Sequence, residues 1–146
     1  SVNTDDFFNK IDTQLKKESE VNAAATAAAK NRKFLEQVIA RLNPTVRTYE
    51  SKLKNRGINV EMDHYPAEIR IKLRYKSGDY KGLSIGEEVK SGRIGLSTLF
   101  REDSKSYRSR DDTTYDQSNW EDSIFIDRLQ GLIEDFVSDA NKHGGI

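Results

Sequence analysis

The chain has 146 residues with 24 basic and 24 acidic side chains, a formal net charge of zero and a mean hydropathy of −0.79. This length suits a single domain, residues 1–146, and the charge balance argues against a dedicated nucleic-acid binder, which usually has a basic excess. The absence of cysteine excludes a disulfide framework, a thiolate zinc site and a cysteine nucleophile.

No segment approaches the roughly 18 apolar residues that a membrane span needs. We therefore expect a cytoplasmic protein that does not enter a membrane and needs no cofactor or metal ion. The chain begins with Ser1 rather than Met, so a leader removed from the N-terminus is an alternative.

Residues 4–42 are predicted to form one long helix, with or without a break near Ser19, and with Thr4 as its N-cap. Such a helix would span roughly 58 Å, more than the width of a domain this small. It must therefore break, project, or pack against a copy of itself. The apolar and alanine positions expected to form the interaction face are Phe8, Ile11, Leu15, Ala25, Ala28, Leu35 and Val38.

Pro44 is predicted to end this helix and to begin a short second one, because proline lacks the amide that a helix interior uses. Val46, Tyr49 and Leu53 have helical spacing, and Gly57 suits the C-terminal cap. The helical part of the chain is thus predicted to occupy residues 1–57.

The stretch "EIRIKLRY", residues 68–75, alternates apolar and charged residues and predicts a half-buried strand. The preceding strand, residues 58–63, is expected to pair with it across the connection "HYPA". That register places Glu61 opposite Arg70, so the cationic face is partly compensated. Two interpretations stay open: a solvated, internally paired face, or an anion-binding one.

The turn "KSG" predicts a hairpin that aligns Leu83 with Ile71 and places Tyr80 opposite Arg74. A further strand is predicted over residues 93–100. Residues 101–119 are polar, and a short fourth strand near 105–110 and a mobile loop are both consistent with them.

The final helix is predicted over residues 118–142, with Ser118 and Glu121 as a capping box. The expected fold is therefore an α+β two-layer sandwich. A long N-terminal helix, a short second helix and the C-terminal helix would cover one face of an antiparallel meander of three or four strands, residues 58–110.

The sequence contains no phosphate-binding loop, no dinucleotide fingerprint, no H-E-x-x-H and no G-x-S-x-G. The acidic stretch "DDTTYD" lacks the order of a calcium loop. His64, beside Asp63, is the one candidate general base, for a small hydrolase-like enzyme. Adjacent strand residues point to opposite faces, however, so Asp63 need not orient His64.

These observations favour a non-enzymatic protein–protein interaction module that binds an unknown protein or itself through the long helix. The alternative is nucleic-acid binding through the basic strand face, residues 70–76, and the end of the second helix. The cations expected to form that candidate anion-binding face are Lys52, Lys54, Arg56, Arg70, Lys72 and Arg74.

Overall fold

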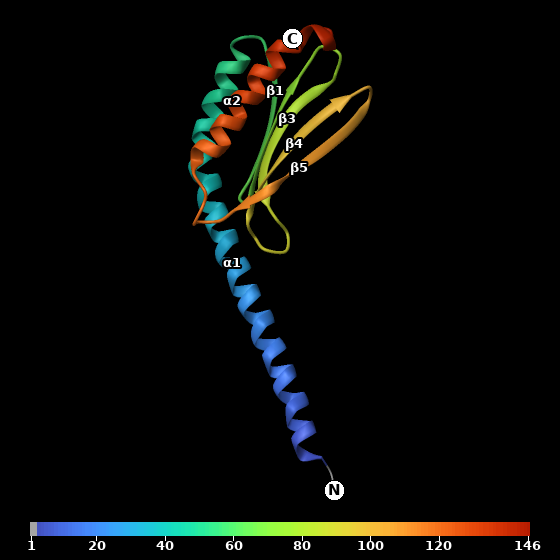
Figure 1. Cartoon of the computed structure of the whole chain (residues 1–146). Coiled ribbons are helices and arrows are strands. Elements are labelled where there is room, and N and C mark those ends of the chain that lie inside the picture. The colour runs from blue at the N-terminus through green and yellow to red at the C-terminus, as the bar shows by residue number, and fades with distance from the viewer. Residues whose placement is uncertain (1–2) are drawn as a thin grey trace.

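The computed structural model describes residues 3–146 and has an α+β fold with two layers (Figure 1). Five strands form an antiparallel meander in the order β1 to β5, and the helices lie on one face of it. The elements are α1 (Thr4–Lys54), β1 (Asn59–Tyr65), β2 (Glu68–Arg74), β3 (Tyr80–Glu87), β4 (Ile94–Glu102), β5 (Lys105–Tyr115), α2 (Asp122–Ser138) and the 3-10 helix η1 (Ala140–His143).

Helix α1 runs without interruption through Pro44, so the prediction of two separate helices was wrong. The apolar stripe explains why. Leu42 and Val46 are buried on either side of the proline, and the stripe keeps its phase from Leu35 to Leu53. Pro44 and Ala40 lie on the exposed side, where water can reach the Ala40 carbonyl that the proline leaves without an amide donor.

The first helix begins at residue 4 as predicted, but the N-cap predicted for each helix was wrong. Asn3, not Thr4, caps α1, and its side chain accepts a hydrogen bond from the Asp6 amide at 3.3 Å. Helix α2 begins at Asp122, and the Ser118 hydroxyl donates to Asp116 instead of capping the helix. At α1 a neighbouring side chain of similar capping ability took the place of the expected one. At α2 the N-cap residue is Glu121, whose side chain makes no capping hydrogen bond.

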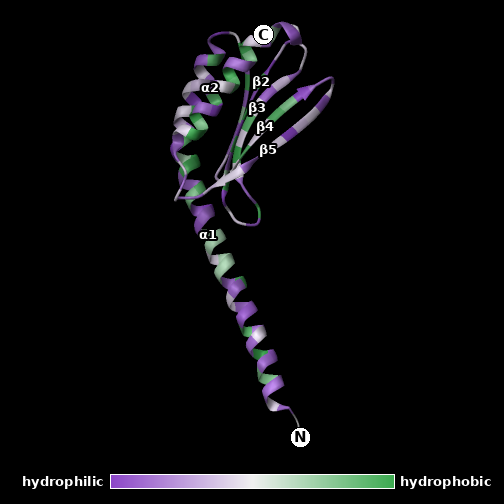
Figure 2. Cartoon of the chain, viewed as in Figure 1, coloured by the Kyte–Doolittle hydropathy of each residue, from purple (hydrophilic) through white to green (hydrophobic). Residues whose placement is uncertain are grey.

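The first half of α1 extends away from the rest of the molecule, and it does not break near Ser19 (Figure 1). Residues 4–26, here called the projecting segment, are exposed except for the half-buried Ile11. At 1.5 Å per residue this segment is roughly 35 Å long. Hydrophobic residues are scattered along it and become denser where α1 meets the sheet (Figure 2).

The first hairpin has a tighter turn than predicted, because Pro66 and Ala67 alone connect β1 and β2. Tyr65 pairs with Glu68, and Glu61 therefore pairs with Lys72 rather than with Arg70. The shift is two residues, so every side chain keeps its predicted face. The second hairpin confirms the prediction: Leu83 pairs with Ile71, and Tyr80 with Arg74.

Residues 105–115 form a full strand, which makes the sheet five-stranded rather than three- or four-stranded. The β4–β5 turn consists of Asp103 and Ser104, both with positive φ, 52° and 66°. Strand β5 lies at one edge of the sheet and is exposed along most of its length. No layer covers it, which is why its sequence lacks the alternation of apolar and polar residues that marks β2.

The core fills the space between the helix layer and the sheet. Tyr75, at the end of β2, stacks on Phe136 of α2 with 4.1 Å between ring centroids. Its hydroxyl donates to the Phe136 carbonyl oxygen at 2.8 Å. The fully buried members of the core with the largest side chains are Phe125, Phe136, Leu35, Ile39, Ile69, Ile71, Leu73, Ile85, Ile94, Leu96 and Leu129.

Candidate functional site

The predicted interaction face of α1 is divided by the fold. Phe8 and Leu15 are 55% and 62% exposed on the projecting segment, with Ile11 between them. Leu35 and Val38, in contrast, are completely buried in the chain's own core. The surface that α1 can offer to a partner therefore ends before residue 35.

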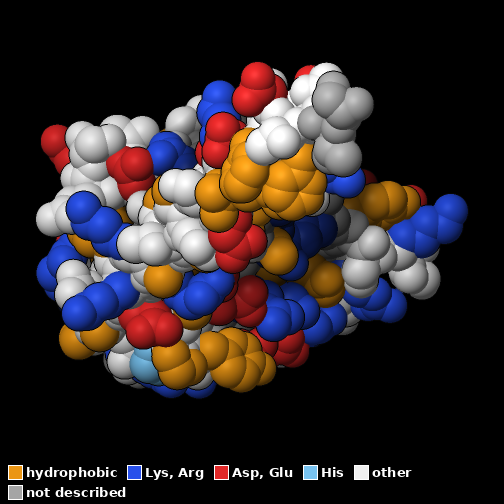
Figure 3. All heavy atoms as spheres, turned by 90° about the horizontal axis from the view of Figure 1, so that it is seen from below, with side chains coloured by type: hydrophobic (Ala, Val, Ile, Leu, Met, Phe, Trp, Pro, Cys, Tyr) orange, Lys and Arg blue, Asp and Glu red, His pale blue; other side chains and the backbone are white. Residues whose placement is uncertain are grey.

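A loop of the domain body marks that end. The β3–β4 loop reaches α1 near Ala28, where the Asn31 side-chain amide donates to the Ser91 carbonyl oxygen at 3.0 Å. The next residue of α1, Arg32, forms an ion pair at 2.7 Å with Glu87, the last residue of β3. Ala25 is exposed, and Ala28 is half-buried beneath the loop. Seen from the N-terminal end of α1, hydrophobic side chains lie among charges of both signs (Figure 3).

The second candidate surface is the sheet face opposite the helices, here called the open face. Arg70, Lys72 and Arg74 extend from β2 onto it, as predicted. Lys52 and Lys54 belong to the end of α1, in the helix layer on the other side of the sheet. The six predicted cations thus do not form one surface.

Strands β4 and β5 add three arginines to the open face that the sequence analysis missed. The register aligns Arg70 with Ser84, Ser97 and Arg110, and it aligns Lys72 with Gly82, Leu99 and Arg108. Near the end of β4, Arg101 pairs with Tyr80 of β3, which in turn pairs with Arg74 of β2. Arg101 therefore lies in the same row as Arg74. The alternation in "YRSR", residues 107–110, is the sequence signal for Arg108 and Arg110.

Two cations of β2 are neutralised locally. Arg74 donates two hydrogen bonds to Glu61, both at 3.0 Å, and Arg70 donates one to Glu68 at 2.8 Å. The hydrogen bonds from Arg74 lower the pKa of the Glu61 carboxyl, and its pairing with Glu61 raises the pKa of Arg74. Tyr80 lies beneath Lys72 and Arg74, whose charged groups are 4.8 and 5.1 Å from the ring centroid.

Small residues form the floor between these cations. Gly82, Ser84 and Ser97 are buried in the middle of the open face. Arg108 donates to the Ser97 hydroxyl oxygen at 3.3 Å, whereas the Ser84 hydroxyl has no hydrogen-bond partner among the described residues. A cavity of about 240 Å³ opens beside this floor, lined by Arg70, Lys72, Tyr80, Leu99, Ser106, Tyr107 and Arg108.

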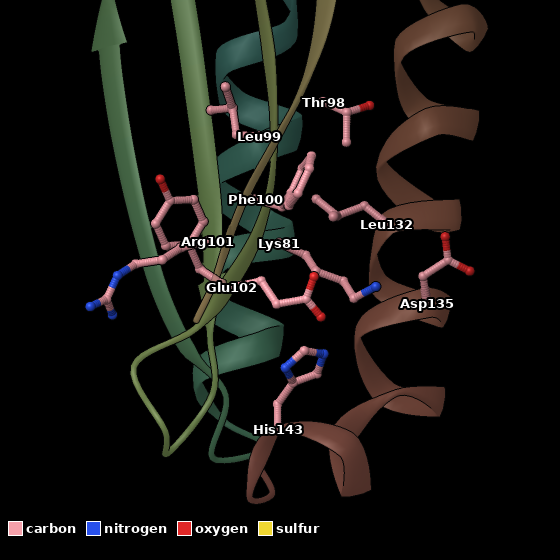
Figure 4. Close-up of a pocket in the computed structure, with 10 residues that line it drawn as sticks. Lys81, Thr98, Leu99, Phe100, Arg101, Glu102, Leu132, Asp135 and His143 are labelled. Carbon is pink, nitrogen blue, oxygen red and sulfur yellow. The ribbon is translucent and has the colours of Figure 1, made fainter. Parts of the chain in front are cut away.

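A groove lies on the other side of the sheet, between β4 and α2 (Figure 4). Lys81, Glu102 and Asp135 border it, whereas Arg101 points away to the open face. Two of its ionisable groups lie in pairs with residues at its edge: Lys81 with Asp139 at 2.7 Å, and His143 with Asp79 at 3.0 Å.

His143 of η1 stacks on Tyr75 with 4.5 Å between ring centroids. Together with its contact to Asp79, this stacking fixes η1 against the end of the sheet. His64 lies on β1, facing α1 near Glu36 and Asn43, and Asp63 points to the opposite face. The structure therefore does not bring Asp63 to His64.

Among residues 3–146, no group of three or more His, Cys, Asp and Glu side chains is arranged to hold a metal ion. No helix in that range has the length and apolarity to cross a membrane. Comparison with protein-family models, curated proteins and solved structures finds no match to this chain. The functional argument therefore depends on the surfaces themselves.

Proposed function

We propose that this protein is an interaction module that forms a homodimer through the projecting segment of α1, with the two helices antiparallel. The observation that carries the proposal is the exposure of Phe8 and Leu15 on a free helix. Most of a helix's stability in a protein comes from the packing of an apolar face, and the projecting segment has no such packing within its own chain. A second helix against it supplies that packing.

The distribution of side-chain size favours a second copy as the partner. Phe8, Ile11 and Leu15 form an apolar tip, and Ala23, Ala24 and Ala25, at the opposite end of the projecting segment, form an alanine segment. Bulky side chains pack best against small ones, because the helix axes can then stay close together. Each copy of the helix has both the bulky tip and the small alanine segment, so two copies can pack tip against alanine segment twice.

The same distribution favours the antiparallel orientation. A parallel pair would bring tip to tip and alanine to alanine, so the axes would be forced apart at one end and leave a gap at the other. It would also place both domain bodies side by side. An antiparallel pair sets each tip against the partner's alanine segment and separates the bodies, in a two-fold arrangement typical of homodimers.

The molar mass in solution tests association. The wild-type chain is expected to elute with the mass of a dimer in size-exclusion chromatography with light scattering. Leu15→Glu should shift it to a monomer, because a buried unpaired carboxylate is costly. Lys17→Glu, two residues away, is the matched control for an added acid and should remain a dimer. A wild-type monomer at all concentrations would refute the proposal.

Cross-linking tests the relative orientation of the two helices. Because the chain contains no cysteine, only the introduced thiols can react. Chains with Ala25→Cys alone should not cross-link to one another through a short bismaleimide. A mixture of Ile11→Cys and Ala25→Cys chains should give mixed dimers. Efficient cross-linking of Ala25→Cys chains to themselves would indicate a parallel pair instead.

A further inference from the structure

We propose that the open face binds the sugar–phosphate backbone of a nucleic acid without reading its base sequence. The site consists of two rows of cations and the serine floor between them. One row is Arg70 and Lys72 on β2, and the other is Arg108 and Arg110 on β5. This site is independent of the helix proposed for dimerisation, because it lies on the opposite side of the sheet from α1.

The spacing of the rows suits a linear polyanion. Three strand spacings separate β2 from β5, which is roughly 14 Å, and cations on one strand repeat about every 6.8 Å. Long arginine side chains can reach inward from both rows toward a strand between them. Between Arg70 and Arg110 stand only the small residues Ser84 and Ser97, and between Lys72 and Arg108 stand Gly82 and the buried Leu99.

The charge on this face is only partly compensated. Glu61 and Glu68 neutralise Arg74 and Arg70. Within the described part of the chain, four open-face cations have no carboxylate at ion-pair distance. They are Lys72, Arg101, Arg108 and Arg110. The pKa of the Glu88 carboxyl is lowered mainly by its hydrogen bonds from Ser91 and only slightly by the charge of Arg110, with which it forms no ion pair.

The floor carries a donor without an acceptor. Ser84 is 1% exposed, and its hydroxyl is unpartnered in the described chain. The Ser97 hydroxyl accepts from Arg108, which leaves its own proton free to donate. A phosphate oxygen between the rows would accept these hydroxyl protons and the guanidinium hydrogen bonds together. Arginine forks match phosphate geometry well.

The same floor argues against two other polyanions. A folded acidic protein would need an apolar anchor at the centre of its interface, but Leu99 and Tyr80 are only 6% and 8% exposed. Single-strand binding proteins stack bases on aromatic rings. Tyr80 is covered by Lys72 and Arg74 and cannot serve in this way. In the space between the rows, only contacts with the backbone are available. The exposed rings of Tyr65 and Tyr107 lie at the margins of this space.

Fluorescence anisotropy with a labelled random-sequence duplex tests the proposal, with single strands and polyglutamate of equal charge as further probes. The wild-type protein should bind duplex at low salt, bind single strands no more tightly, and bind polyglutamate more weakly. Arg108→Gln with Arg110→Gln should weaken duplex binding about tenfold or more. The slope of log affinity against log salt should fall by nearly two.

Lys52→Gln with Lys54→Gln is the matched control, since it removes the same charge from the helix layer. It should change affinity less than twofold, and Arg108→Lys with Arg110→Lys should retain most of the binding. Ser84→Ala should weaken binding while raising the melting temperature of the free protein, because it removes an unsatisfied buried hydroxyl.

Three results would overturn the proposal. These are absence of duplex binding at low salt, an equal loss in the two glutamine pairs, and polyglutamate binding as tight as duplex. Unchanged affinity in the Ser84→Ala protein would also count against it, since the phosphate would then not lie between the rows. Circular dichroism of each variant verifies that it is folded.

Discussion

Arg41 of α1 donates two hydrogen bonds to the carboxylate of Asp122, the first residue of α2, with N–O distances of 2.7 and 2.8 Å. The Trp120 indole donates a third at 2.8 Å. These contacts join the two helices at the point where α2 begins. The hydrogen bonds from Arg41, and then that from Trp120, lower the pKa of Asp122.

Asp122→Asn should lower the free energy of unfolding at pH 7 by about 1 kcal/mol, because this partly exposed ion pair is lost. The folded-state pKa of Asp122 lies below its unfolded value of about 4. Its stabilising effect is therefore complete above that value and disappears as the pH falls through the folded-state pKa. Urea unfolding at pH 7 and at low pH should show the difference between variant and wild type shrinking. A constant difference, or an equal effect of Glu121→Gln, would contradict this assignment.

Tyr75→Phe should lower the free energy of unfolding by about 1–2 kcal/mol, because the Phe136 carbonyl loses its buried donor. Burial raises the pKa of the Tyr75 phenol to about 12. The neutral form is thus favoured in the folded state, and this contribution is present below pH 10 and lost as the pH rises toward 12. Ultraviolet titration should show one late tyrosine that vanishes in the variant. Tyr107→Phe, at an exposed position, should leave the late transition in place.

Gly92 in the β3–β4 loop combines a positive φ with a close approach to α1. Comparing Gly92→Ala with Gly57→Ala should separate the cost of the backbone conformation from the cost of the steric overlap. A methyl group on Gly92 would overlap the Ala28 carbonyl oxygen, and φ is +70°. Gly57 has a similar φ of +80° but nothing within 4 Å. Gly57→Ala should therefore cost about 1 kcal/mol from the left-handed backbone alone, and Gly92→Ala about 2–3 kcal/mol. Thermal unfolding measures the loss of stability in both variants. Equal losses would show that the β3–β4 loop moves away from Ala28 without an energetic penalty.

Pro44→Ala should raise the free energy of unfolding by about 2 kcal/mol, since the new amide can donate to the Ala40 carbonyl inside α1. Part of the gain is offset because proline also restricts the unfolded chain. Denaturant unfolding tests this, with Thr45→Ala at the next exposed position as the control for helix propensity. A loss of stability would mean that the proline sets a bend on which the packing of α1 depends.

Features that depend on local periodicity followed from the sequence. The alternation over residues 68–75 correctly placed Ile69 and Ile71 in the core and Arg70 and Lys72 on the other face. The presence of the last helix, the "KSG" hairpin and the great length of the first helix were equally predictable. Each of these depends on residues close in sequence, so that the burial pattern repeats with the period of the element.

Other features were decided by contacts between distant segments. Pro44 lies within a helix because burial of Leu42 and Val46 outweighs one missing hydrogen bond. Strand β5 forms because β4 pairs with it, and an exposed edge strand needs no apolar face. The same pairing sets Arg108 and Arg110 across the open face from Arg70 and Lys72. The sequence by itself thus determined which face of the regularly alternating strands is apolar. Only the register of four successive strands decided that Ser84 and Ser97 are buried on the open face and which charges meet there, because each turn adds its own offset.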